Sequence, residues 1–151
     1  MFFKKSATVN FLSAEEKAAI VLAIQQAEKK TSGEIRVFIE KKCKYVDALD
    51  RARELFAGLE MHKTIHRNGV LIYVAYKDRQ LAVFGDEGIH AKVGDEYWQN
   101  TVSGILGYFK AGNIYQGLKE GISFLGDALI KHFPYHNEDK NELTDDIVFG
   151  D

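Results

Sequence analysis

Acidic side chains placed at the borders of apolar segments are the residues of this sequence best suited to chemistry. Glu34 precedes a segment of alternating apolar residues, and Asp86 and Glu87 lie on a turn bounded by glycines. Carboxylate oxygens, with Asn and backbone carbonyl oxygens nearby, are the ligands that Ca²⁺ and Mg²⁺ prefer. We therefore take Glu34, Asp86 and Glu87 as candidate ligands of a divalent cation, with Asp95 as a fourth.

Each of these residues also has a purely structural interpretation. Glu34 could be a surface charge, Asp86 and Glu87 could form an ordinary turn, and Asp95 could cap a helix. The Asp, Asn and Gly spacing of an EF-hand is absent from the sequence. The sequence therefore leaves both the ion site and the structural interpretation open.

The segment 67–88 indicates how the acidic residues could be brought together. Residues 70–76 are apolar or aromatic without a break, which favours a strand buried on both faces. A short polar break at 77–79 and a second apolar run at 81–84 indicate a hairpin. A hairpin returns the chain to the end of the sheet where it began, so we expect 68–69 and 85–88 to lie side by side.

The strand expected over 34–40 begins with Glu34, the remaining candidate ligand. A helix predicted from about Asp47 separates this strand from the next, so the two strands should be parallel. Parallel strands begin at the same end of a sheet, which places Glu34 beside Asn68 and Gly69. The three segments should then meet at one end, with Glu34, Asp86 and Glu87 as neighbours.

The remaining patterns predict four helices in all. Ser13 and Glu16 form a capping box for the first helix, and apolar stripes predict two helices after Gly88 that end near Pro134. The order is helix, strand, helix, strand, strand, helix, helix. It predicts a three-layer α/β/α sandwich with a small mixed sheet of three to four strands.

Composition limits the domain organisation and the classes of partner. The 151 residues are 46% hydrophobic, enough for one domain, expected over 1–135. Residues 136–151 carry six acidic residues and one Lys, and we expect a flexible tail whose apolar residues 147–149 could dock on a neighbouring surface.

The formal net charge and the apolar runs exclude several other classes. A net charge of −2 and dispersed basic residues argue against nucleic-acid binding. No apolar run is long enough for a membrane span, and the first residues do not resemble a signal peptide, so we expect a cytoplasmic protein.

The other reactive residues lack the neighbouring groups that catalysis or metal binding would require. Asp78 and Arg79 fall at the far end of the hairpin, where they suit a turn or, alternatively, an ionic or phosphate contact. His62 and His66 have a metal-binding spacing but no third ligand, and Cys43 has no base that could be placed beside it.

Four segments in order resemble the TPM domain family, also called the TPM phosphatase domain. They are the residues 31–37, 67–74, 78–79 followed by 85–89, and 109–118. The resemblance covers about 13–131. It implies an α/β/α sandwich, binding of divalent cations, chiefly Ca²⁺, and a proposed acid phosphatase activity. We expect neither the signal peptide nor the membrane anchor and glycine-rich tail of envelope and thylakoid members, so those roles are not carried over.

Three functions follow as expectations. The first is a domain that binds Ca²⁺ or Mg²⁺ and regulates or binds an unidentified protein partner. The second is a metal-assisted phosphomonoesterase at the same place, in which the ion polarises the phosphoryl oxygen. No arginine is expected to assist it, because Arg79 lies at the other end and Arg67 only flanks the site. The third is an interaction module that needs no metal.

Overall fold

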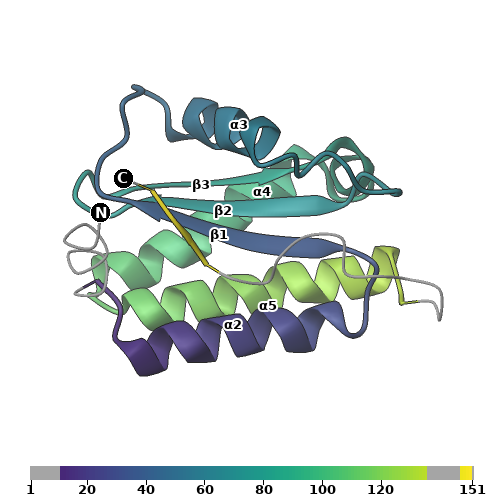
Figure 1. Ribbon diagram of the computed structural model, residues 1–151, viewed down its shortest axis with the longest axis horizontal. Helices are drawn as coiled ribbons and strands as arrows, with labels where there is room; N and C mark the ends of the chain where they lie inside the picture. The colour runs from purple at the N-terminus through teal and green to yellow at the C-terminus, as the bar shows by residue number, and fades with distance from the viewer. Residues whose placement is uncertain (1–10, 136–146, 151) are drawn as a thin grey trace.

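The computed structural model describes residues 11–135 and 147–150. This part of the chain holds four helices and four strands (Figure 1). Their bounds are α2 Ala14–Glu28, β1 Glu34–Glu40, α3 Ala48–Gly58, β2 Gly69–Ala75, β3 Gln80–Gly85, α4 Glu87–Lys110, α5 Ile114–His132 and β4 Val148–Phe149.

The strands form one mixed sheet in the order β3-β2-β1-β4. β1 and β2 are parallel, and β2 and β3 are an antiparallel hairpin. The hairpin, the parallel pair and the α/β/α sandwich predicted from the sequence are therefore confirmed. The parallel pairing follows from the crossover through α3, because parallel neighbours cannot be joined by a tight turn.

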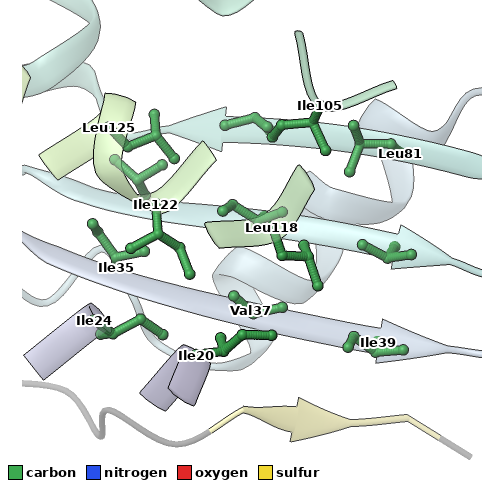
Figure 2. Close-up of a cluster of buried hydrophobic side chains, with 14 of the residues drawn as sticks. Ile20, Ile24, Ile35, Val37, Ile39, Leu81, Ile105, Leu118, Ile122 and Leu125 are labelled. Atoms are coloured by element: carbon green, nitrogen blue, oxygen red, sulfur yellow. The ribbon is translucent and has the colours of Figure 1, made fainter. Parts of the chain in front are cut away.

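Helices cover both faces of the sheet (Figure 1). One face packs against α2, α4 and α5, and Figure 2 shows this cluster, to which β1 contributes Ile35, Val37 and Ile39. The other face packs against α3, and there β1 contributes Phe38. Because successive strand residues point to opposite faces, the unbroken apolar run of β2 supplies both cores.

Local signals set most helix starts, with one correction. The capping box of Ser13 and Glu16 is present, with Glu16 N donating to Ser13 Oγ at 3.0 Å. α4 starts before the position expected from Asp95, because Asp86 is its N-cap. Gly94, with φ 78° and ψ 173°, interrupts the helical geometry, and Asp95 follows this kink. None of the helices in the described residues has the length and apolarity that crossing a membrane requires.

The last described residues extend the sheet. β4 pairs in parallel with β1, Val148 opposite Phe38 and Phe149 opposite Ile39, and Gly150 N donates to Ile39 O at 2.7 Å. Val148 packs on the α3 side and Phe149 on the α2 side. Part of the segment expected to be a flexible tail thus forms a strand, while 136–146 and 151 lie outside the described residues.

Candidate cation site at the Glu34 end of the sheet

Backbone pairing brings the three acidic segments to one end of the sheet, which we call the Glu34 end. Glu34 lies opposite Gly69 across β1 and β2, and its N–H donates to Asn68 O at 3.4 Å. Val70 lies opposite Gly85 across β2 and β3, and Asp86 N donates to Gly69 O at 2.9 Å. The expected meeting of these segments is therefore confirmed at the level of the backbone.

Glu34 and Asp86, the residue after β3, lie on either side of Gly69. Opposed residues on neighbouring strands point to the same face, here the face covered by α3. Two strand spacings separate their Cα atoms by about 10 Å. Both residues are buried, with relative exposures of 3% and 4%.

The charge nearest to Asp86 is a guanidinium. Arg67 Nε lies 2.7 Å from Asp86 Oδ2, and Nη2 lies 2.8 Å from Oδ1. Nη1 lies 3.0 Å from Glu87 Oε1. The hydrogen bonds to Asp86 raise the pKa of Arg67 above its ordinary value, so the guanidinium remains charged. Arg67 was expected only to flank the site, whereas it lies within it.

The backbone of Arg67 also holds the start of α4. Its φ of 51° is left-handed, and its carbonyl oxygen accepts from Gly88 N at 2.8 Å and Ile89 N at 3.3 Å. These contacts satisfy two of the N–H groups that lack a partner at a helix start. Asp86 Oδ1 satisfies a third, accepting from Glu87 N at 2.8 Å. Arg67 and Asp86 therefore have a structural role whatever else they bind.

The other candidates occupy different surroundings. The Asp95 side chain is 88% exposed and lies beside His90, whose Nε2 is 3.6 Å from Asp95 Oδ1 and whose Nδ1 accepts from Trp98 Nε1 at 2.9 Å. No described contact joins Asp95 to Glu34, Asp86 or Glu87. Asn68 is buried and donates from Nδ2 to Ser32 Oγ at 3.1 Å, while Asn68 Oδ1 has no hydrogen-bond partner among the described residues.

These residues fit a divalent cation only after one rearrangement. Over the ranges 11–135 and 147–150, no three His, Cys, Asp or Glu side chains are arranged to hold a metal ion. Asp86 and Glu87 do converge on one point, but Arg67 fills it. A cation could bind these oxygens only if the guanidinium moved away.

A second polar cluster, at the carboxyl end of β1, was not expected from the sequence. Glu40 accepts from Arg51 Nε at 2.9 Å and Nη2 at 3.0 Å, and from the hydroxyl of Tyr73. Burial, followed by the hydrogen bond to Glu40, raises the pKa of Tyr73. The sequence signal was a Glu at the last position of the predicted strand, but nothing indicated its partner.

The remaining reactive residues are dispersed. The side chain of His62 is exposed, and the ring of His66 lies 6.2 Å from that of Phe133, centroid to centroid. Asp78 Oδ2 accepts from Cys43 N at 2.7 Å, which ties the hairpin turn to the segment after β1. Asp78 thus has the structural role considered for it.

Comparisons with known proteins agree with this architecture. The NMR structure of BA42 protein from the psychrophilic bacterium Bizionia argentinensis is 48% identical, covers 93% of this chain and 96% of its own, and has a TM-score of 0.85. The N-terminal domain of a P. gingivalis protein is 19% identical, covers 83% of each chain and has a TM-score of 0.62, which shows a shared fold. No curated protein matches the chain.

The family model of the TPM domain matches residues 6–128. The match includes the four segments whose order resembled that family, and it includes the whole Glu34 end of the sheet. The chain therefore belongs to the TPM domain family.

Proposed function

We propose that this TPM domain binds a divalent cation, Ca²⁺ or Mg²⁺, at the Glu34 end of the sheet in exchange for Arg67. One observation carries the proposal: a single guanidinium lies within 3.0 Å of carboxylate oxygens from both Asp86 and Glu87. Carboxylate oxygens that already surround one positive charge are also suitable ligands for a hard divalent cation in the same position. The Arg67 side chain is 42% exposed, so its guanidinium can turn into solvent while the cation takes its place beside the buried Asp86 carboxylate.

The proposed ligands are side chains at the end of the strands. Asp86 and Glu87 supply carboxylate oxygens, and Asn68 Oδ1 supplies an amide oxygen. Glu34, which pairs with Gly69 in the strand register, lies at the same end of the sheet and is a further candidate ligand. Asp95 is left out of this set, because its side chain is 88% exposed and no described contact joins it to Asp86 or Glu87. Water would complete the coordination, as is usual for Mg²⁺ and for weak Ca²⁺ sites.

A regulatory role follows from what Arg67 holds in place. Its side chain fastens the loop 62–68 to the start of α4, and this loop presents Ile65 with 82% of its surface exposed. Cation binding would remove the side-chain contact while leaving the backbone bonds to Gly88 and Ile89. The cation would therefore loosen the loop without unfolding α4, and change the surface offered to a partner.

Two substitutions of opposite expected sign test the exchange. Arg67→Gln removes the competing charge, so Ca²⁺ affinity measured by isothermal titration should rise about tenfold, or ~1.4 kcal/mol. Asp86→Asn removes a ligand and should abolish binding. Lys63→Gln makes the same charge change in the same loop, but Lys63 pairs with Glu60 and should leave the affinity unchanged.

Two results would contradict the proposed exchange of Arg67 for a cation. Unchanged or weaker affinity in Arg67→Gln would show that Arg67 does not compete with the ion. No rise in melting temperature of the wild type at millimolar Ca²⁺ or Mg²⁺ would favour the metal-independent interaction module, since a ligand at 100 times its Kd adds about 2.7 kcal/mol.

A metal-assisted phosphomonoesterase is the second candidate, and the position of Arg67 favours it. A guanidinium beside metal-binding carboxylates could stabilise the charge on a phosphoryl group. The two functions make different predictions for one variant. Arg67→Gln should tighten cation binding in both cases, but should lower the release of phosphate from a phenyl phosphate ester only if the domain is an enzyme. Phosphate release that survives both Arg67→Gln and Asp86→Asn would come from a contaminant.

A further inference from the structure

A hollow of about 530 Å³ lies at the other end of the sheet, beside the turn between β2 and β3. Its walls come from the end of β2, the turn into β3, the end of α4, the start of α5 and Phe11, which lies three residues before α2. Pockets for small ligands commonly have volumes of about 300–1,000 Å³. The hollow is separate from the Glu34 end, where Arg67 and Asp86 lie.

Large apolar side chains line this hollow and are only partly buried by the protein. Phe11 and Tyr76 are stacked with ring centroids 4.7 Å apart, and both pack on the edge of the larger core cluster. The other large apolar side chains in the wall are also half-buried members of that edge: Leu106, Phe109 and Ile114. An apolar molecule in the hollow would complete their burial and extend the core.

The charges in the wall are all positive. Arg79 and Lys110 line the hollow, and no Asp or Glu does. In the described part of the chain, neither cation takes part in an ion pair. Two exposed cations beside an apolar hollow favour a ligand with an anionic head and an apolar body.

The backbone conformation at Arg79 is one that a long side chain does not favour. Its φ of 54° is left-handed, a conformation that glycine adopts freely and a long side chain does not. A residue held in such a conformation costs about 1–3 kcal/mol and is often found at functional sites. Asp78 beside it already stabilises the turn through Cys43 N, so the turn itself does not require a guanidinium at 79.

We propose that this hollow binds a small carboxylate of the fatty-acid class. The alkyl chain of the ligand would lie against Phe109, Leu106 and Ile114. Its carboxylate would contact Arg79, whose guanidinium can bind both carboxylate oxygens at once. Lys110, the last residue of α4, also lines the hollow and adds a second positive charge. The site needs no metal and is independent of the cation exchange at Arg67.

Decanoate and decanol, which share an alkyl chain and differ in charge, test the proposal. Titration followed by amide chemical shifts in NMR should give saturable binding of decanoate, with the largest changes at Tyr76, Arg79 and Gly112. Decanol should bind about tenfold more weakly, since a hydrogen bond to a charged group is worth about 1.5–3 kcal/mol. Equal affinities, or changes that map elsewhere, would overturn the proposal.

The variant Arg79→Gly separates binding from folding. Glycine suits the left-handed turn, so the melting temperature should stay the same or rise, while the preference for decanoate over decanol should be lost. Glu60→Gly is the matched control, because Glu60 also has a left-handed φ, of 58°, but lies outside the hollow. A preference that survives Arg79→Gly would contradict the role of the guanidinium.

Discussion

The amide nitrogen of Gly88 lies 2.8 Å from the carbonyl oxygen of Arg67, so the first turn of α4 rests directly on the loop before β2. A Cβ atom at Gly88 would lie 2.0 Å from His66 O and 2.7 Å from Arg67 O. The start of α4 can therefore lie this close to the loop before β2 only because residue 88 has no side chain.

The substitution Gly88→Ala should destabilise the domain. The added methyl group meets backbone oxygens, which cannot turn aside, so the loop and the helix must separate at a cost of about 2–3 kcal/mol. Gly104→Ala, in the same helix, is the control. Nothing lies within 4 Å of its Cβ position, so it should stabilise the domain by about 0.5–1 kcal/mol. Urea denaturation measures both, and equal effects would contradict the close packing at Gly88.

Removal of the Asp86 side chain should be costly in the absence of any metal. Asp86→Ala takes away the N-cap of α4 and leaves Arg67 without its bidentate partner. We expect a loss of about 2–3 kcal/mol in the free energy of unfolding. Asp95→Ala should change it by less than about 0.5 kcal/mol, because that side chain is 88% exposed. A large effect at Asp95 would show that the kink after Gly94 depends on it.

The pair of Glu40 and Arg51 should behave as a coupled unit. The two side chains are 7% and 15% exposed, so Arg51→Met leaves a buried carboxylate whose remaining described partner is Tyr73. The expected loss is about 3 kcal/mol. Adding Glu40→Leu to Arg51→Met should recover part of this loss, because the unpaired charge disappears. Losses that simply add in the double variant, measured by denaturation, would show that the pair is not coupled.

Stability should fall at alkaline pH as buried tyrosines ionise. Burial raises the pKa of Tyr97 from its ordinary value of 10.0 to about 12, so the contribution of Tyr97 to stability is complete below pH 10 and is lost as the pH rises toward 12. Melting temperatures across this range should fall less steeply for Tyr97→Phe than for the wild type. Tyr108→Phe, at an exposed position, is the control. Parallel curves for Tyr97→Phe and wild type would contradict the prediction.

Local sequence pattern was sufficient to predict β1, β2 and β3 and the meeting of their acidic segments at the Glu34 end of the sheet. The unbroken apolar run of β2 and the polar break after it could only suit a buried strand followed by a turn, and the helix between β1 and β2 required a parallel pair. Glu34 and Asp86 therefore lie at the same end of the sheet although 52 positions separate them. β4 escaped prediction because its two residues carry too short a pattern to identify a strand.

What each side chain binds could not be deduced in this way. Arg67 pairs with Asp86 across 19 positions, and Tyr73 with Glu40 across 33. Periodicity indicates which face a residue occupies, whereas a salt bridge also depends on the path of a loop and on left-handed residues such as Arg67. The amino-acid sequence by itself determined the sandwich, the hairpin and the acidic end of the sheet. Only the tertiary structure decided that a guanidinium fills the point where those acids converge, because that contact exists only once the loop 62–68 is packed on α4.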